Sequence, residues 1–459
     1  MQPSNSSAPV HEAWSSRLVF IMAAVGAAVG LGNLWKFPYT AGVSGGAAFV
    51  IVYMGAVAVV AIPIVIAELL IGRRGRMSPP ASFQRLAEEA GAGKAWRFVG
   101  FVNLLAVFVI LSFYSVIAGW ALAYVPKLLA GEFAGADADA VAQAFSGLLA
   151  SPGKLTVLHT IFMGMTVAIV SLGIKRGIEN AVKFLMPALF AMLLLLVGYA
   201  AVEGDMARTV EFLFQADFSK ITAPVVLQAI GQAFFSVSVA MGLLVTYGAY
   251  LDKGASLPRS SALIAGADTL VALLAGLAIF PIVFAHGLDP AEGPGLVFVT
   301  LPLSFAQMPG GSLFGAMFFV LLIVSALTST IAVLEPMVAW LEEKGFRRRN
   351  GAMIAGGLAW LLGLATVLSF NVWSDFHPLA GVDRFATATV FDLLDFLTTN
   401  ILLPVGGILI AVFAGWVITR SALDDELSDF PAPLYAAWRF LLRFLVPAAV
   451  AWVLFENAL

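Results

Sequence analysis

The sequence predicts an all-α protein that crosses a membrane many times. Of its 459 residues, 61% are hydrophobic and only 12% are charged, and long apolar segments recur along the whole chain. A soluble protein of this length could not bury so much apolar surface. A glycine-rich stretch, AVGAAVGLGNLWKFP at 24–38, stands inside the first apolar segment. Because glycine weakens a helix, this stretch predicts a spanning helix that is interrupted within the membrane.

Eleven apolar segments are long enough to cross a bilayer, which takes about 20 residues each. They lie near 18–41, 47–72, 95–126, 155–173, 179–202, 226–251, 261–286, 311–343, 350–370, 388–418 and 432–456. Segment 226–251 also holds polar and glycine residues at its middle. Interruptions five helices apart are typical of an inverted repeat. We expect a cytoplasmic N-terminal segment (1–17), a first repeat of five spans (18–202), a second repeat with extracellular loops (203–418) and an eleventh helix (419–459).

Basic residues set the expected orientation, since basic loops stay on the cytoplasmic side. They are concentrated after spans 2, 4, 6 and 8. These loops contain Arg73, Arg74, Arg76, Arg85, Lys94, Arg97, Lys175, Arg176, Lys253, Arg259, Lys344, Arg347, Arg348 and Arg349. The N-terminus is therefore expected in the cytoplasm and, after eleven spans, the C-terminus outside.

The composition excludes several classes of function. The chain has no cysteine, which excludes disulfides, zinc–thiolate sites and thiol catalysis. The net charge of −3 gives no support to nucleic-acid binding. The histidines His11, His159, His286 and His377 are scattered, which argues against an enzyme, and no repeated filter indicates a channel. The polar N-terminus lacks the pattern of a cleaved signal peptide.

The interrupted spans indicate a carrier. In hydrocarbon, a broken helix is tolerated only where the freed backbone groups line a cavity or bind something. Secondary transporters use such breaks to build a central site for substrate and ions.

Several motifs resemble the neurotransmitter:sodium symporter family. They are GLGNLWKFPY at 30–39, GQAFFSVSVAMG at 231–242, TYGAY at 246–250, GLVFVTLPLSFAQMPGG at 295–311, LTSTIAVLEPM at 327–337 and DLLDFLTTNILLPVGG at 392–407. The similarity covers nearly the whole chain, in order. It implies the LeuT fold in a bacterial plasma (inner) membrane, and sodium-driven uptake of amino acids or related amines.

The resemblance implies two sodium sites. The first would use the carbonyl oxygens of Gly26, Val29 and Ser325 and the hydroxyls of Thr328 and Ser329. Sodium is a hard cation that prefers oxygen ligands. The residues alone leave an alternative open, because such hydroxyls often bond back to their own helix.

The second sodium site is implied at the Ala28 carbonyl, the side chains of Asn33, Ser236 and Asp268, and the substrate carboxylate. Asp268 stands in an apolar helix, ALIAGADTLVALL, where an ionised carboxylate is costly unless it is paired. A bound cation would remove that penalty. A protonated or helix-end aspartate is the alternative.

Chloride-dependent relatives hold chloride with a Tyr, Gln, Ser, Asn and Ser cluster. This chain matches it at Tyr53, Gln232 and Ser236, but Asp268 replaces the Asn and Ala272 the last Ser. A fixed carboxylate supplies the negative charge that chloride would bring, so no chloride requirement is expected. Proton counter-transport through Asp268 after sodium leaves is a further hypothesis.

The resemblance also implies a site for a zwitterionic α-amino acid, since helix-end amides attract anions and unwound carbonyls attract cations. The carboxylate would meet the amides of Leu31 and Gly32 and the Tyr114 hydroxyl, and the ammonium the carbonyls of Ala28, Phe235 and Ser236 and the Ser238 hydroxyl. From the residues alone, Tyr114 is equally an aromatic side chain packed between helices.

The implied side-chain pocket contains no net charge, so a neutral, mostly apolar substrate is expected. Its walls would be Ala27, Ile110, Phe235, Met241, Ser329 and Val333. Gly30 stands where monoamine carriers of the family have an aspartate, which disfavours amines without a carboxylate. Ala240 stands where many amino-acid carriers have glycine, which favours aliphatic substrates over tryptophan.

A gate is implied on each side of the site. Lys36 and Asp395 match the outer charge pair, although a lysine extending outward from a helix end is the alternative. The cytoplasmic gate would comprise Trp14, Tyr250, Glu343 and, at the position of the family's arginine, His11. Arg17 could serve in place of the histidine.

Gly177 and Pro187 are expected to permit unwinding of span 5, which would admit water to the first sodium site. A plain helix start and a packing kink are the alternative. The alternative function is a LeuT-fold carrier driven by protons, or a sodium-linked amino-acid sensor. The expected partners are a neutral amino acid and the lipid bilayer, and the sequence predicts no oligomeric state.

Overall fold

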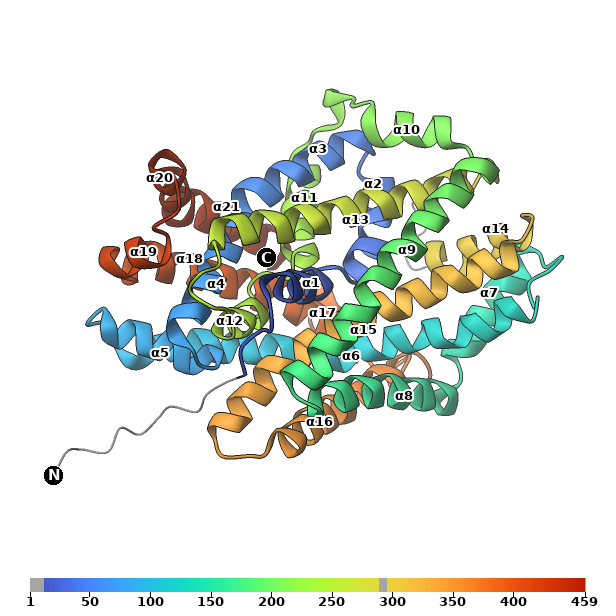
Figure 1. Cartoon of the computed structure of the whole chain (residues 1–459). Coiled ribbons are helices and arrows are strands. Elements are labelled where there is room, and N and C mark those ends of the chain that lie inside the picture. The colour runs from blue at the N-terminus through green and yellow to red at the C-terminus, as the bar shows by residue number, and fades with distance from the viewer. Residues whose placement is uncertain (1–11, 289–294, 459) are drawn as a thin grey trace.

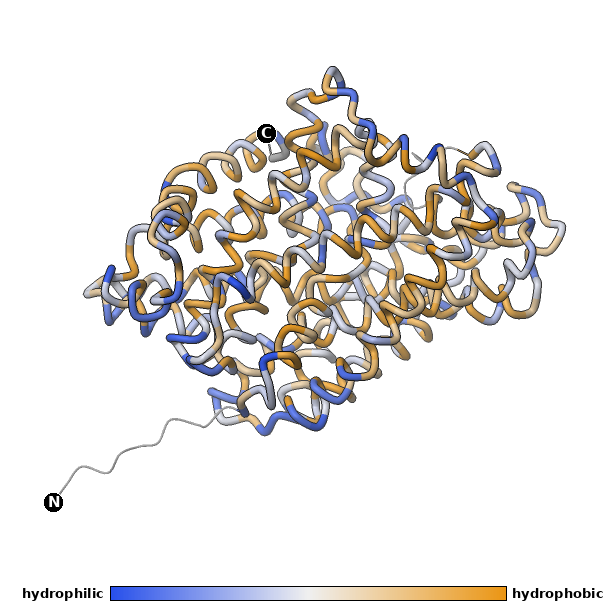
Figure 2. Tube along the Cα trace, turned by 45° about the horizontal axis from the view of Figure 1, so that its top comes forward, coloured by the Kyte–Doolittle hydropathy of each residue, from blue (hydrophilic) through white to orange (hydrophobic). Residues whose placement is uncertain are grey.

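The computed structural model describes residues 12–288 and 295–458, and every regular element within these ranges is a helix. Long helices run side by side across the molecule, and shorter ones lie at its two ends (Figure 1). Apolar residues cover most of the helical length, and many of the hydrophilic residues lie in the connections (Figure 2). This arrangement confirms the predicted all-α membrane fold.

The first span is broken at the glycine-rich stretch, as predicted. Helix α1 (Arg17–Ala28) is followed, after a short break, by η1 (Gly32–Lys36) and α2 (Phe37–Val43), at an angle of 51°. Gly30 lies in the break. A Cβ atom there would lie 2.6 Å from the Tyr114 hydroxyl and 2.7 Å from the Ser329 hydroxyl. Only glycine therefore allows the break to approach both helices that carry these residues.

The sixth span is also broken. It consists of α11 (Ala223–Ser236) and α12 (Leu243–Ala249). Between them the backbone turns left-handed three times, with φ of 56° at Ser238, 65° at Ala240 and 71° at Gly242. Two of these residues carry a Cβ atom, for which this conformation is unfavourable. In Figure 1, α12 lies next to α1 near the middle of the molecule.

Nine further spans in the described part of the chain are long and apolar enough to cross a membrane without a sharp bend. They are built from α3 (Ala47–Ala56), η2 (Val57–Ala61) and α4 (Ile62–Gly75); η3 (Lys94–Trp96) and α6 (Arg97–Leu129); α8 (Pro152–Ser171); η4 (Ile174–Glu179) and α9 (Asn180–Glu203); α13 (Leu257–Ala285); α15 (Gly311–Glu343); α16 (Arg348–Ser369); α17 (Val390–Phe396), η8 (Leu397–Leu402), α18 (Leu403–Val412) and η9 (Phe413–Val417); and α20 (Ala432–Phe440), η10 (Leu441–Leu445) and α21 (Val446–Ala458).

The count of eleven spans follows only if broken helices are joined. By length and composition the described residues give nine spans, or ten with the bent first span. The predicted sixth segment does not pass this test, because α11 and α12 are each too short to cross and the break between them is long. All eleven predicted segments nevertheless coincide with helices to within a few residues.

Short helices that the sequence analysis did not predict connect the spans. Figure 1 shows α5 (Pro79–Glu89) and α19 (Arg420–Glu426) near one end, and α7 (Ala138–Leu149) and α14 (Leu301–Ala306) near the other. The remaining connecting elements are α10 (Met206–Phe214), η5 (Phe218–Lys220), η6 (Leu296–Thr300) and η7 (Asp383–Phe385).

Two long helices form the frame against which the breaks are held. Helices α6 and α15 pack along each other through the middle of the molecule (Figure 1). Ile110 and Tyr114 lie on α6, and Thr328 and Ser329 lie on α15. The frame therefore brings residues of the predicted substrate and sodium sites to the break in the first span.

Candidate functional site

A buried carboxylate lies between the two broken spans. Asp268, on α13, is fully buried. Its Oδ2 accepts hydrogen bonds from the Ser236 hydroxyl at 2.6 Å and the Tyr53 hydroxyl at 3.4 Å, and its Oδ1 accepts one from Asn33 Nδ2 at 2.8 Å. The three side chains predicted for the second sodium site therefore meet in the structure.

The Asn33 side chain is oriented in an unexpected way. Its amide nitrogen faces Asp268 and also donates to the Ser236 hydroxyl at 3.0 Å, whereas its oxygen accepts from the Gly30 amide at 3.0 Å. The Asp268 carboxylate thus accepts from one amide N–H and two hydroxyls. For the Asn33 oxygen to bind a cation at this place, the amide has to turn.

A second cluster of oxygen atoms lies where α15 faces the break in span 1. The Ser329 hydroxyl is 3.1 Å from the carbonyl oxygen of Val29, 3.2 Å from that of Ser325 and 3.4 Å from that of Gly26. The Thr328 hydroxyl donates to the Ser325 carbonyl at 2.9 Å. All five groups predicted for the first sodium site are thus joined, and all of them are neutral. The back-bonding that the sequence left open as the alternative also occurs.

The groups predicted to hold the substrate are arranged around the same break. Tyr114 accepts a hydrogen bond from the Leu31 amide at 2.9 Å, and Ser238 donates to the Ala27 carbonyl at 3.3 Å. Gln232 donates to the Gly32 carbonyl at 2.9 Å. These contacts link span 1 to α6 and join the two broken spans to each other.

The other predicted wall residues are buried nearby. Ile110 lies one helical turn before Tyr114, and Val333 lies one turn after Ser329. Met241 is buried in the turn of span 6, and Ala28 is the last residue of α1. Ala272, where chloride-dependent relatives have a serine, is buried one turn after Asp268 on α13.

A cavity of about 290 Å³ reaches this region from one side of the molecule. It is lined by Leu31, Trp35, Lys36, Tyr39, Phe113, Tyr114, Ile117, Phe235, Phe391 and Asp395. Lys36 and Asp395, the predicted outer charge pair, share this cavity. No salt bridge joins them, because the Lys36 ammonium lies over the Phe235 ring, 4.3 Å from its centre, and Asp395 accepts from the Thr399 hydroxyl.

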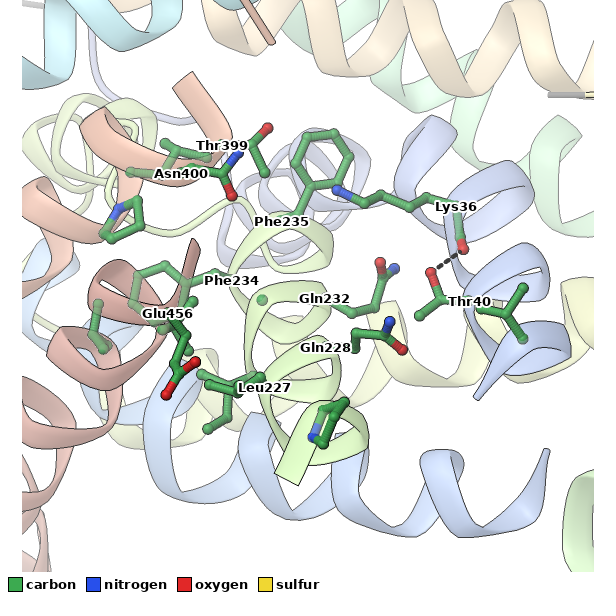
Figure 3. Close-up of a pocket in the computed structure, with 18 of the residues that line it drawn as sticks. Lys36, Thr40, Leu227, Gln228, Gln232, Phe234, Phe235, Thr399, Asn400 and Glu456 are labelled. Carbon is green, nitrogen blue, oxygen red and sulfur yellow. Dashed lines mark hydrogen bonds between the residues drawn. The ribbon is translucent and has the colours of Figure 1, made fainter. Parts of the chain in front are cut away.

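A second, more polar cavity of about 450 Å³ lies on the other side of Phe235 (Figure 3). Lys36 extends toward the Phe235 ring. Gln228 and Gln232 lie below Phe235 in Figure 3 and project from the helix that carries it, α11. Glu456, on α21, borders the cavity from the opposite side. Lys36 and Phe235 therefore form a partition between the two cavities.

The opposite end of the site, where the sequence predicts the cytoplasmic gate, is closed by the N-terminal segment. Trp14 is buried, and its indole N–H donates to the Tyr247 carbonyl at 3.0 Å. Its backbone N–H donates to the carbonyl of Tyr250, and the Tyr250 hydroxyl donates to Glu335 at 2.9 Å. Arg348 in turn contacts Glu335 at 2.5 Å.

The other residues predicted for the cytoplasmic gate take no part in the bonds described above. Glu343 accepts hydrogen bonds from the backbone and hydroxyl of Ser78, at the start of α5. Arg17, the substitute considered for the gate arginine, is an exposed residue at the start of α1. His11 lies outside the described residues.

The start of span 5 is bound to the N-terminal segment. The Glu12 carboxylate accepts from the amides of Ile174 and Lys175 at 3.0 and 3.1 Å, and the Ser15 hydroxyl donates to Glu179 at 2.6 Å. Gly177 lies in the opening π-helical turn, η4, and Pro187 lies inside α9. These positions fit the plain helix start and packing kink as well as the predicted unwinding, which stays a prediction.

A sequence model of the sodium:neurotransmitter symporter family matches residues 11–143 and 138–458. The chain belongs to this family. Members are sodium-coupled transporters, so the chain is a sodium-dependent membrane transporter and not an enzyme. The sequence-based assignment to this family and to the LeuT fold is therefore confirmed.

Individual relatives agree with this membership. An uncharacterised sodium-dependent transporter of Bacillus subtilis, YhdH, is 37% identical over 443 residues, which cover 95% of each chain. A crystal structure of the symporter MhsT in complex with L-phenylalanine is 41% identical, with a TM-score of 0.88 over 98% of this chain and 100% of that one. The dog sodium- and chloride-dependent taurine transporter is 24% identical over 82% of this chain.

Some residues of the symporter's centre were missed from the sequence. Glu68, on α4, is fully buried, and its carboxylate accepts from the amides of Ala240 and Gly242, each at 3.3 Å. An ionisable residue inside an apolar span indicates function, so Glu68 and Glu335 carried a signal that could have been used. Their partners on distant helices could not be inferred from spacing.

Proposed function

We propose that the chain imports a neutral, mostly apolar α-amino acid together with sodium, by alternating access. The observation that carries this proposal is the meeting of Asn33, Ser236 and Asp268 at the place where both broken spans expose backbone groups. A zwitterion suits this centre, because amides lie at one side of the break in span 1 and free carbonyls lie at the other.

Sodium would bind at two places. The cluster at Ser329 supplies five neutral oxygen ligands from two helices, which suits a hard monovalent cation. The cluster at Asp268 supplies a carboxylate, and the substrate's own carboxylate would complete it. Sodium and substrate would then stabilise each other's binding directly, since they share a charge contact.

The proposed substrate is aliphatic. The uncharged pocket walls favour an apolar side chain, and the relative MhsT, whose crystal structure contains L-phenylalanine, supports an amino-acid substrate without favouring the aliphatic class. Ala240 precedes Met241 in the turn, and its methyl group would stiffen the break where many amino-acid carriers have glycine. We rank leucine-sized side chains above tryptophan for this reason.

Chloride would not be required. When ionised, Asp268 would supply a negative charge beside the Tyr53 and Ser236 hydroxyls, where a bound chloride would otherwise balance sodium. Proton counter-transport is part of the proposal, with Asp268 taking a proton on the return of the empty carrier.

The proposed orientation places the N-terminus in the cytoplasm of a bacterial inner membrane. The Trp14 closure then lies on the inner side, and the cavity at Lys36 and Asp395 opens to the outside. Movement of the N-terminal segment away from Tyr247 and from the start of span 5 would open the inner path.

Uptake by purified protein in liposomes tests the proposal. An inward sodium gradient is expected to drive accumulation of radiolabelled leucine or alanine, equally in chloride and gluconate. An inward proton gradient without sodium is expected to drive none. Accumulation driven by protons alone would instead support the proton-coupled alternative.

A further inference from the structure

Helix α6 carries an asparagine that has no part in the transport site described above. Asn103 is fully buried, and its amide nitrogen donates a 2.7 Å hydrogen bond to the carbonyl of Ala240, in the break of span 6. It precedes Tyr114 by eleven residues, or about three helical turns. Asn103, Ile110 and Tyr114 therefore lie on one face of α6, so the helix that forms the pocket wall also contacts the turn beside the pocket.

The residue that Asn103 contacts is conformationally strained. Ala240 has a φ of 65°, a left-handed conformation that is unfavourable for a residue with a Cβ atom. Its amide is bound by the Glu68 carboxylate at 3.3 Å, and its carbonyl is bound by Asn103. Both polar groups of this peptide position are thus held by side chains from two different helices, which opposes relaxation of the turn.

The Asn103 side chain is a poor choice for stability alone. Its Oδ1 atom is buried without a hydrogen-bond partner. An amide with half of its polar groups unpaired is worse for folding than an apolar side chain of the same size. The amide cannot turn over to improve this, because its oxygen would then face the Ala240 carbonyl. The hydrogen bond to the Ala240 carbonyl is therefore the interaction that accounts for an asparagine at this buried position.

We propose that Asn103 is a positioning residue that sets substrate selectivity by holding the turn at Ala240 and Met241. This inference rests on the proposed function, because Met241 is expected to form part of the substrate pocket. A held turn keeps the pocket small. Without the Asn103 amide, the turn can move to admit substrates with larger side chains. It is then also less preorganised to bind substrates with small side chains.

The experiment uses the purified full-length protein in detergent with sodium. Half-saturating concentrations of alanine, leucine and phenylalanine are measured by thermal stabilisation in the wild type, Asn103→Ala and Asn103→Leu. Asn103→Leu keeps the volume, so that a folding defect of the alanine variant does not decide the result. Asn371→Ala is the matched control, since its amide also donates to a backbone carbonyl, that of Leu149 at 2.9 Å, and it lies in the turn after α16.

Both Asn103 variants are expected to bind the preferred amino acid about fivefold more weakly, the equivalent of one hydrogen bond. They should also discriminate less among the three side-chain sizes, whereas Asn371→Ala changes neither quantity. Ala240→Gly provides the decisive readout, because glycine adopts a positive φ without strain. The double variant Asn103→Ala, Ala240→Gly should bind the preferred amino acid with an affinity within about twofold of that of the Ala240→Gly single variant.

Asn103 variants that behave like Asn371→Ala, or a double variant no better than Asn103→Ala, would overturn this inference alone. A wild type that binds no amino acid in sodium would overturn the proposed function and this inference with it.

Discussion

Two clusters of oxygen atoms lie beside the break in the first span, and they differ in charge. The cluster at Asp268 contains a buried carboxylate, surrounded by donors from Asn33, Ser236 and Tyr53. The cluster at Ser329 contains only hydroxyls and backbone carbonyls. A buried charge must be compensated in every state of the cycle, whereas neutral oxygens need only weak hydrogen bonds when no cation is present.

We therefore expect the two clusters to have different roles in transport. The Asp268 cluster links sodium, substrate and charge balance, so its loss should change ion dependence as well as affinity. The Ser329 cluster joins α1 to α15, so its loss should weaken sodium binding without changing which ions are needed. The first two variants below test that distinction, and the last two concern charged pairs outside the clusters.

The largest effect is expected for Asp268→Asn. Sodium-dependent amino-acid binding should weaken about 100-fold or more in gluconate, because removing one partner of a buried charge costs about 3–5 kcal/mol. Binding should recover partly in chloride, since Tyr53, Gln232 and Ser236 remain. Thermal stabilisation by leucine, titrated with sodium in both salts, measures this. Asp424→Asn, an exposed aspartate of α19, is the control and should behave as wild type.

Equal loss in chloride and gluconate would show that Asp268 does not occupy the role of chloride.

A smaller effect is expected for Ser329→Ala. The hydroxyl that contacts three carbonyls is lost, and sodium affinity should fall about tenfold, in line with one or two hydrogen bonds or ligands. The loss should be the same in both salts, as measured by the same titration. Ser146→Ala, on the surface of α7, is the control. If the sodium affinity of Ser329→Ala differed between chloride and gluconate, the proposed difference between the two clusters would be wrong.

Lys36→Arg should strengthen the outer closure. An arginine can pair with the Asp395 carboxylate through two parallel hydrogen bonds, which the lysine does not do. Dissociation of bound amino acid should slow about threefold, a modest gain because the pair borders solvent. Exchange of radiolabelled leucine measures the rate. In the Asp395→Asn background the gain should vanish, and its persistence would exclude pairing as the cause.

The smallest effect concerns an exposed pair. The hydrogen bond from the Arg74 guanidinium holds the pKa of Glu89, on α5, below its usual value. The stabilisation is therefore present above the unfolded value of 4.5 and is lost as the pH falls through the folded value. Since Glu89 is 39% exposed, Glu89→Gln should lower stability by about 0.5 kcal/mol or less at pH 7. Melting temperatures at pH 7 and pH 4 should show this difference shrinking in acid; a constant difference would contradict the assignment.

The sequence predicted the helices and the breaks because both depend on local composition. The glycines at 26–32 interrupt span 1, and the polar residues near Ser238 interrupt span 6. The candidate ligands Thr328, Ser329 and Asp268 came from motifs in single helices. Contacts between distant helices, such as Glu68 and Asn103 with the turn at Ala240, have no local pattern. The orientation of the Asn33 amide depends on which groups surround it, and sequence names the residue type but not the atom that faces the carboxylate.

The most direct test of the account is thermal stabilisation of the purified wild type by a panel of amino acids, in sodium and potassium, as chloride and gluconate salts. A ligand that binds only the folded state raises the melting temperature by mass action. The account predicts stabilisation by neutral aliphatic amino acids in sodium alone, equal in both anions. Stabilisation without sodium, or only in chloride, would contradict the central claim that Asp268 and sodium together form the binding site.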